Sequence, residues 1–192
     1  MEVLPIWVKN MVSKRDIRKH VLLNRKEMSK REWEENSQLI YERVVSHHFF
    51  LNADEIYCYV DFKNEVGTKK ILESAWSCQK KVAVPKIFGD DMRFYYIEKL
   101  DELEEGYFGI LEPIDTREAK GSNVLVIMPG AAFDKEKHRI GYGKGFYDKY
   151  LEKHPNYQTM ALAFEMQMVE NIPADEYDIC PKIIITEEHI YA

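Results

Sequence analysis

The chain has 192 residues, of which 45% are hydrophobic and 31% charged, a composition typical of a globular protein with one well-buried domain. Its net charge of −6 argues against a dedicated nucleic-acid binder, because phosphate backbones are usually bound by a basic face, but it is compatible with a local basic pocket for a small anion. Its three cysteines form no CxxC pair, and no apolar run approaches the roughly 20 residues of a membrane helix, so we expect a reduced, cytoplasmic protein that uses no membrane.

Two helices are predicted at the N-terminal end from their capping residues. Ser29 and Glu32 form a capping box, and Ser13 begins a similar but weaker pattern. These caps predict helices from Lys14 to Met28 and from Lys30 to His47.

Short apolar runs farther along the chain are predicted as strands. They are Ile56–Val60, Val82–Ile87 with Pro85 inside it, Met92–Ile97, Val124–Met128, Met160–Phe164 and Ile183–Thr186. Between them, helices are predicted to begin at Thr68 and near Phe146, and a polar turn of helix at Asp101–Glu105. The run Val124–Met128 is apolar throughout, which is typical of a central strand buried on both faces.

The alternation of strands and helices predicts an α/β fold. We expect a single domain over residues 13–192, with a largely parallel central sheet flanked by helices in three layers (α/β/α). Residues 1–12 are predicted to be an N-terminal extension. In such sheets the ligand crevice lies beyond the carboxyl ends of the strands, so the segment after Val124–Met128 is the first place to look for chemistry.

That segment combines glycines, cations and a carboxylate within a few residues. Its polar and glycine positions are Arg139, Gly141, Gly143, Lys144, Gly145 and Asp148. Glycines let backbone amides approach an anion closely, and a helix that starts just after them adds further amides. A carboxylate beside phosphates is well suited to hold Mg²⁺. The segment therefore favours a nucleoside triphosphate with its metal.

Other interpretations of the same residues remain open from the pattern alone. A GxGxG triplet is a weak signal, and Arg139 could be a solvated loop cation. Asp148 could complement a helix dipole, and the neighbouring aromatic residues could be core packing. The segment is neither a Walker A loop nor part of a protein-kinase motif set.

A longer stretch of sequence decides between these interpretations. PGAAFDKEKHRIGYGKGFYDKYL resembles the signature of the 5-formyltetrahydrofolate cyclo-ligases, also called methenyltetrahydrofolate synthetases, which carry PGxxFD followed by RxGxGxGYYD. The similarity continues over nearly the whole chain. It includes KRDIR (14–18) followed by Arg25, YVDFKNEVGT (59–68), VPKI (84–87), FGILEP (108–113) and IPADEYD (172–178). The resemblance implies the family's NagB/RpiA/CoA-transferase-like fold.

The resemblance also implies an ATP site around the glycine segment. Its residues would be Arg139, Gly141, Tyr142, Gly143, Lys144, Gly145, Phe146 and Tyr147, of which Arg139, Lys144 and Tyr147 would be catalytic. Lys14 and Arg18 would reach the phosphates from the first helix, although their spacing alone favours a solvated helix face. Lys86 would be a further cation near the site.

For the metal and the folate, the resemblance implies two more groups of residues. Asp148 and Asp178 would hold Mg²⁺. Glu65 would accept a pair of N–H donors from the pterin, as a carboxylate can. Val60, Phe108, Tyr142 and Phe146 would line the folate pocket. Phe146 stands where the family usually has a tyrosine, so a hydroxyl is missing there.

The implied reaction is the ATP- and Mg²⁺-dependent closure of 5-formyltetrahydrofolate to 5,10-methenyltetrahydrofolate, with release of ADP and phosphate after phosphorylation of the formyl oxygen. Phosphoryl transfer needs positioning and charge neutralisation more than a protein nucleophile, and the sequence has no evident Ser-His-Asp or Cys-His set. We expect small-molecule substrates only and a monomer or weak homo-oligomer. The competing hypotheses are a sugar-phosphate isomerase, which would not consume ATP, and a folate or nucleotide binder without catalysis.

Overall fold

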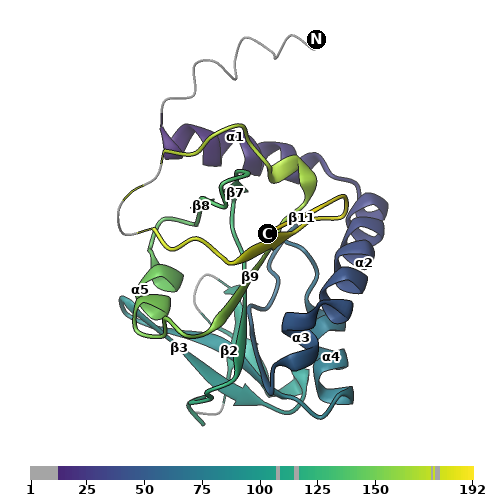
Figure 1. Cartoon of the computed structure of the whole chain (residues 1–192), viewed down its shortest axis with the longest axis vertical. Helices are drawn as coiled ribbons and strands as arrows, with labels where there is room; N and C mark the ends of the chain where they lie inside the picture. The colour runs from purple at the N-terminus through teal and green to yellow at the C-terminus, as the bar shows by residue number, and fades with distance from the viewer. Residues whose placement is uncertain (1–12, 107–108, 115–116, 174, 176–177) are drawn as a thin grey trace.

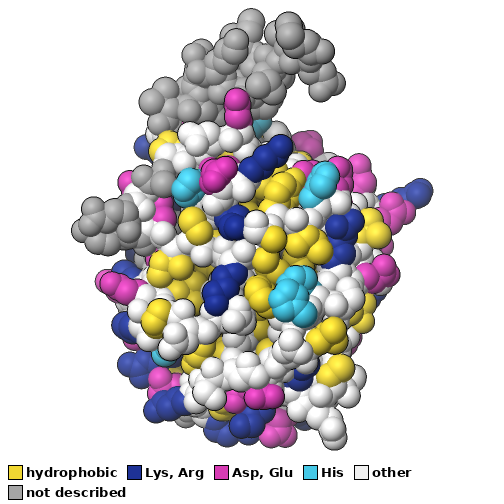
Figure 2. Space-filling view, viewed as in Figure 1, with side chains coloured by type: hydrophobic (Ala, Val, Ile, Leu, Met, Phe, Trp, Pro, Cys, Tyr) yellow, Lys and Arg dark blue, Asp and Glu magenta, His cyan; other side chains and the backbone are white. Residues whose placement is uncertain are grey.

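The computed structural model describes residues 13–192 apart from 107–108, 115–116, 174 and 176–177. The predicted extension, residues 1–12, lies outside this part of the chain. None of the helices found in the described residues is long and apolar enough to cross a membrane. On the face drawn in Figure 2, acidic and basic side chains are interspersed among apolar ones.

The two N-terminal helices are confirmed to within a residue. α1 spans Lys14–Glu27 and α2 spans Lys30–Ser46. The predicted capping box at the start of α2 is present, because the Ser29 hydroxyl accepts from the Glu32 amide and the Glu32 carboxylate accepts from the Ser29 amide. A short helix that was not predicted, α3 (His48–Asn52), follows α2 directly.

A seven-stranded sheet forms the centre of the described structure. Its strands are β1 (Glu55–Cys58), β2 (Lys81–Phe88), β3 (Asp91–Ile97), β6 (Val124–Met128), β9 (Gln158–Leu162), β10 (Ile183–Ile185) and β11 (Ile190–Tyr191). They lie in the order β11-β10-β9-β6-β1-β2-β3. Strands β10, β9, β6, β1 and β2 are parallel, and the outer strands β3 and β11 pair antiparallel. The predicted α/β fold with a largely parallel sheet is confirmed.

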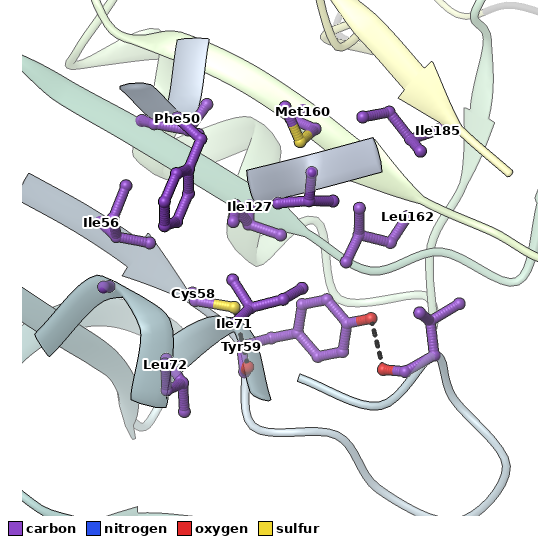
Figure 3. Packing of buried hydrophobic residues seen from close by; sticks show 14 of the residues in the cluster. Phe50, Ile56, Cys58, Tyr59, Ile71, Leu72, Ile127, Met160, Leu162 and Ile185 are labelled. Atoms are coloured by element: carbon purple, nitrogen blue, oxygen red, sulfur yellow. Dashed lines mark hydrogen bonds between the residues drawn. The ribbon is translucent and has the colours of Figure 1, made fainter. Parts of the chain in front are cut away.

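Helices cover both faces of the sheet, as predicted. On one face, α2, α3 and α4 (Lys69–Ser77) pack on a core in which the alternate residues Ile56 and Cys58 of β1 point the same way (Figures 1 and 3). On the other face, Tyr57 packs in a second core with residues of α5 (Phe146–Glu152). β6 is buried along its whole length, which confirms the prediction for Val124–Met128.

α1 does not lie on either face of the main sheet. It lies across one end of the molecule, beside the two-stranded pair β7 (Ala132–Phe133) and β8 (Arg139–Ile140) (Figure 1). Its apolar residues Ile17 and Val21, four positions apart, pack on this pair and on Ile172. This packing places the first turn of α1 near the segment that follows β6.

Two local predictions differ from the structure. The predicted polar turn of helix at Asp101–Glu105 is present only as the 3-10 turn η2 (Leu100–Glu102), and the rest is strand, because β4 (Leu103–Glu105) pairs antiparallel with β5 (Leu111–Pro113). Pairing with residues farther along the chain overrides the local helical preference. Pro85 does not interrupt β2. β1 pairs with β2 only as far as Ala83, so the backbone N–H that proline lacks is not needed for pairing with β1 at position 85.

Candidate active site

A cavity of about 560 Å³ lies where β1 and β6 end. Tyr59 and Val60, directly after β1, and Pro129, directly after β6, contribute to its wall. The position beyond the carboxyl ends of parallel strands is the one expected for a ligand crevice in this fold. α1, the glycine loop between β8 and α5, and the C-terminal segment before β10 complete the wall.

The glycine loop, residues 141–145, has a backbone that only glycine adopts easily. Gly143 has a φ of +104° and Gly145 a φ of +64°. A Cβ atom at Gly143 would lie 3.1 Å from Nη1 of Arg18, and one at Gly141 would lie 2.8 Å from Nη1 of Arg139. The glycines therefore let two guanidinium groups approach the loop backbone. α5 has only seven residues, so the cations and the loop, more than a helix dipole, make this end attractive to anions.

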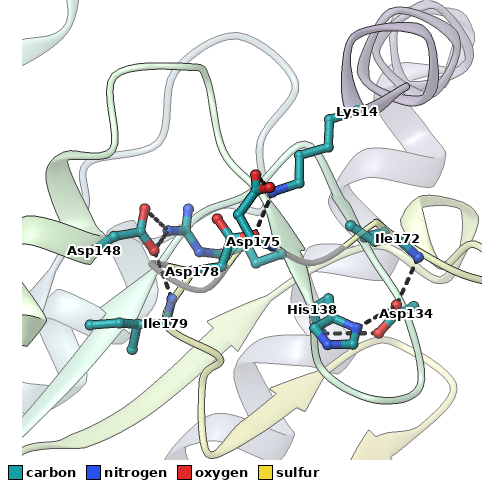
Figure 4. Close-up of polar contacts among 9 residues, drawn as sticks. Lys14, Asp134, His138, Asp148, Ile172, Asp175, Asp178 and Ile179 are labelled. Carbon is teal, nitrogen blue, oxygen red and sulfur yellow. Dashed lines mark hydrogen bonds and ion pairs between the residues drawn. The ribbon is translucent and has the colours of Figure 1, made fainter. Parts of the chain in front are cut away.

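Two ion pairs join the predicted cations to the predicted metal ligands. Nη2 of Arg139 donates to both oxygens of Asp148, at 2.9 and 3.0 Å. Nζ of Lys14 donates to Asp178 and, at 2.5 Å, to Asp175, which lies beside Asp178 in Figure 4. Burial by itself raises the pKa of Asp178, but Lys14, the Asp175 amide and the charge of Arg139 together outweigh it and hold that pKa below its usual value.

Other polar groups of the cavity have no partner in the described part of the chain. Nε of Arg139 and the hydroxyl of Tyr147 are buried without a hydrogen bond. Arg18 and Lys144 line the cavity and form no ion pair with any residue that the structure describes. Buried polar groups are rarely left unpaired, so this cluster is suited to a ligand rich in hydrogen-bond acceptors, such as a polyphosphate.

The wall of the same cavity also includes apolar side chains and a buried carboxylate. Glu65 is 8% exposed and accepts hydrogen bonds from the Tyr142 hydroxyl and, at 3.0 Å, from the Phe62 amide. Burial raises the pKa of Glu65, and these two hydrogen bonds oppose the rise. Val60 and Phe146 line the same cavity.

The structure thus brings most of the predicted site residues to one cavity. Those that line it are Lys14, Arg18, Val60, Glu65, Arg139, Gly141, Tyr142, Gly143, Lys144, Gly145, Phe146, Tyr147, Asp148 and Asp178. Phe108 lies outside the described residues. Lys86 does not reach the cavity, which corrects its prediction: Pro85 and Ile87 line the wall, side chains alternate along a strand, and Nζ of Lys86 donates instead to the Pro113 carbonyl at 2.7 Å.

Three acidic residues near the site were not identified from the sequence. Asp175 and Glu112 line the cavity, and both lie inside motifs that had been matched to the family without a role. Asp134 is 1% exposed and accepts from the His138 amide and ring and from the Ile172 amide, each at 2.9 Å (Figure 4). It thereby fixes the turn before Arg139 to the segment that carries the C-terminal acids. Asp134 could have been found from the sequence, because it is the last residue of the matched motif PGAAFD.

Comparison with known proteins agrees with this arrangement. Residues 10–187 match the model of the 5-formyltetrahydrofolate cyclo-ligase family. The mouse 5-formyltetrahydrofolate cyclo-ligase is 29% identical over 191 residues, which cover 92% of this chain and 94% of the mouse protein. The enzyme of the same name from Escherichia coli K12 is 26% identical over 175 residues, which cover 87% of this chain and 96% of that protein.

Solved structures give the same result. The NMR structure of Aquifex aeolicus 5,10-methenyltetrahydrofolate synthetase superposes with a TM-score of 0.82 at 29% identity, over 92% of this chain and 91% of that one. A 5,10-methenyltetrahydrofolate synthetase from Mycoplasma pneumoniae has the same fold, with a TM-score of 0.75 at 24% identity over 91% of this chain and 98% of that one. With the family model matched over most of its length, the chain belongs to the 5-formyltetrahydrofolate cyclo-ligase family.

Proposed function

We propose that this protein closes 5-formyltetrahydrofolate to 5,10-methenyltetrahydrofolate and converts ATP to ADP and phosphate in the same reaction. The observation that carries the proposal is a single cavity whose wall combines cations and a glycine loop with apolar side chains and the buried carboxylate of Glu65. We call the cations and the glycine loop the phosphate end, and Glu65 with its apolar neighbours the folate end. A triphosphate and a reduced pterin bound at these two groups of residues would share the cavity.

At the phosphate end, the chain offers four cations. Arg18 and Lys144 are free of ion pairs among the described residues, and Arg139 and Lys14 are paired with acids that also line the cavity. Arg139 keeps a buried Nε without a partner. We assign these groups to the phosphates of ATP, because phosphoryl transfer requires neutralisation of the negative charge on the oxygens of the transferred phosphoryl group.

The carboxylates of the same end fit a magnesium ion. Asp148 and Asp178 supply the oxygen ligands that Mg²⁺ prefers, and each lies beside a cation assigned to phosphate. When bound there, Mg²⁺ would add positive charge beside the phosphate oxygens. The two aspartates would hold it, and Arg139 and Lys14 would then be released from them to contact phosphate.

At the folate end, Glu65 would accept two N–H donors of the pterin through its two oxygens. Val60 and Phe146 would contact the flat faces of the ring. The absence of a hydroxyl at Phe146 leaves stacking possible without a hydrogen bond from that position.

The chemical step requires the formyl oxygen to become a good leaving group. That oxygen attacks the γ-phosphorus of ATP, and the bond to the β-phosphate oxygen breaks to release ADP. N10 then attacks the formyl carbon and loses its proton, and the carbon–oxygen bond breaks to release phosphate. We assign to Tyr147 a hydrogen bond from its unpaired hydroxyl to a reacting oxygen; burial raises its pKa well above the ordinary value, so the hydroxyl keeps its proton and stays a hydrogen-bond donor.

The test is the formation of methenyltetrahydrofolate, followed by its absorbance, from the purified protein with ATP, Mg²⁺ and 5-formyltetrahydrofolate. We expect one ADP for each methenyl product and no ADP when the folate is omitted. Folded protein that binds adenine nucleotide but forms no methenyl product would contradict the enzymatic proposal. Folded protein with no affinity for adenine nucleotide would contradict the site itself.

We further propose that the protein acts in the cytoplasm on these small molecules, without nucleic acid or membrane, as a monomer or weak homo-oligomer. Size-exclusion chromatography at two protein concentrations, with light scattering, would test the last point.

A further inference from the structure

Arg25 is a buried arginine that the reaction described above does not use. It lies in the last turn of α1 and is 7% exposed, although it is not part of the cavity wall. Its Nη1 donates a hydrogen bond to the Tyr142 hydroxyl at 3.1 Å. Arginine is seldom buried this far without a specific role, because removing its charge from water is costly.

The hydrogen bond from Arg25 leads directly to the folate end of the cavity. The Tyr142 hydroxyl accepts this hydrogen bond and donates one to Oε1 of Glu65. Oε2 of Glu65 accepts from the Phe62 amide. The three side chains thus form a relay from α1 through the glycine loop to the carboxylate. A cation at one end of such a relay strengthens every hydrogen bond along it.

Two further contacts hold the ends of the relay together. The Asn64 side chain donates to the carbonyl of Arg25 at 3.1 Å, and Nε1 of Trp33 on α2 donates to the carbonyl of Glu65 at 2.6 Å. The segment that carries Glu65 is therefore tied to both N-terminal helices. These bonds hold the backbone at Glu65 in place, and the Tyr142 hydroxyl and the Phe62 amide hold its carboxylate.

The charged and titratable groups around Glu65 determine how strongly Arg25 favours its ionised form. Asp61 lies in the same segment, Tyr59 follows β1, Tyr142 belongs to the glycine loop and Tyr147 to α5. Of the nearby cations, Lys63 lies over the Phe62 ring and Arg139 over the Tyr147 ring, whereas Arg25 attracts the charge on Glu65 that Asp61 repels. Burial raises the pKa of Glu65, whereas Tyr142, Phe62 and the charge of Arg25 lower it.

We propose that Arg25 is a positioning residue for the folate: acting through Tyr142, it keeps Glu65 ionised and oriented to accept two N–H donors of the pterin. A protonated Glu65 would offer a donor where the pterin also presents one, and the paired contact would be lost. This inference rests on the proposed function for the identity of the ligand. The coupling between Arg25 and Glu65 can be measured without it.

The first experiment measures that coupling directly. In protein labelled with ¹³C-glutamate, the carboxyl resonance of Glu65 is assigned by its loss in Glu65→Gln and followed against pH. Arg25 lowers the pKa of Glu65, so its removal in Arg25→Gln should move the midpoint to higher pH by about one unit. Arg25→Lys, which keeps the charge, should leave the midpoint close to that of the wild type. A midpoint that is unchanged in Arg25→Gln would overturn the proposal, whatever the protein catalyses.

The second experiment asks whether the coupling serves folate binding. Because ionised Glu65 is required, activity should fall with decreasing pH, and in Arg25→Gln this acid limb of kcat/KM for the folate should lie about one unit higher, which is a tenfold loss on the limb. KM for ATP should stay within about twofold. In the Glu65→Gln background, Arg25→Gln should have no further effect on folate KM.

The outcomes separate the possible failures. If Arg25→Gln raised KM for both substrates equally and its effect added to that of Glu65→Gln, Arg25 would only stabilise the fold, and the proposal would be wrong. If the wild-type protein formed no methenyl product but the Glu65 midpoint moved as expected, the proposed function would fail while the coupling stood. Thermal melting of each variant checks that it is folded.

Discussion

Gly143 is the position where the phosphate site can be tested most sharply, because two features of the structure require glycine there. Its φ is +104°, and a Cβ atom would lie 3.1 Å from Nη1 of Arg18. A non-glycine residue in a sparsely populated region of this kind costs roughly 1–3 kcal/mol. In Gly143→Ala, that strain is relieved only if the loop shifts or if the Arg18 guanidinium moves away from it.

The chain offers a matched control at Gly89, in the turn between β2 and β3. Gly89 also has a positive φ, +60°, but nothing lies within 4 Å of a Cβ atom there. Gly89→Ala should cost roughly 1–2 kcal/mol from the left-handed backbone alone. At roughly 2–4 °C for each kcal/mol in a chain of this size, both variants should melt several degrees below the wild type.

The two variants should differ in activity. Gly143→Ala should lower kcat/KM for ATP by about 10- to 100-fold, because small displacements of positioning groups have effects of that order. Gly89→Ala should match the wild type at temperatures well below its melting point. The assay is the initial rate of methenyl formation with ATP varied at saturating folate. Equal losses in both variants, or full activity in Gly143→Ala, would refute the assignment of the loop to ATP.

Further predictions concern the ion pairs of the cavity. Arg139→Ala should lose turnover and also about 2 kcal/mol of unfolding free energy, because the Arg139 side chain is 5% exposed and Asp148 is left without its partner. Lys144→Ala should lower turnover by at least about tenfold with an unchanged urea midpoint. Asp148→Asn should shift the magnesium dependence of the rate to higher concentrations, and an unchanged titration would contradict its assigned role. Lys14→Met should lower unfolding free energy at pH 7 by less than about 1 kcal/mol, and the difference should shrink as the pH falls from the ordinary aspartate pKa of 3.8 through the lower pKa of Asp178, because a depressed pKa gives stability that is lost over that range. Equal urea midpoint differences at pH 7 and at the lowest pH at which both proteins stay folded would show that the pair contributes nothing through Asp178.

Predictions that depended on neighbouring residues in the chain agreed best with the structure. The capping box of Ser29 and Glu32 and the uniformly apolar Val124–Met128 both report local or fully buried environments, and both are confirmed. The helical turn predicted at Asp101–Glu105 ends early, because Leu103–Glu105 pairs with Leu111–Pro113. The sequence of the segment itself does not indicate that pairing. Secondary structure that is created by tertiary pairing is not visible in a short window.

The candidate site shows the same division. The glycine loop could be found from the sequence because its cations, glycines and acid are contiguous. The contact between Lys14 and Asp178 joins residues 164 positions apart, and only the resemblance to the family suggested that both belong to the site. Lys86 was placed wrongly for a simple reason: alternation along β2 turns it away from the wall that Pro85 and Ile87 form.

α1 carries cations that serve both the phosphate end of the cavity and, through Tyr142, the carboxylate of Glu65. Lys14, Arg18 and Arg25 are spaced by four and seven residues, so they share one side of the helix over three turns, roughly 16 Å along its axis. Ile17 and Val21 fix that helix on β7 and β8. A slip of one residue would rotate the helix by about 100°, break the contacts of Lys14 and Arg25 and turn Arg18 away from the cavity. The same packing that buries α1 therefore sets the distance between the phosphate end and the carboxylate of the folate end, and a single helix positions both.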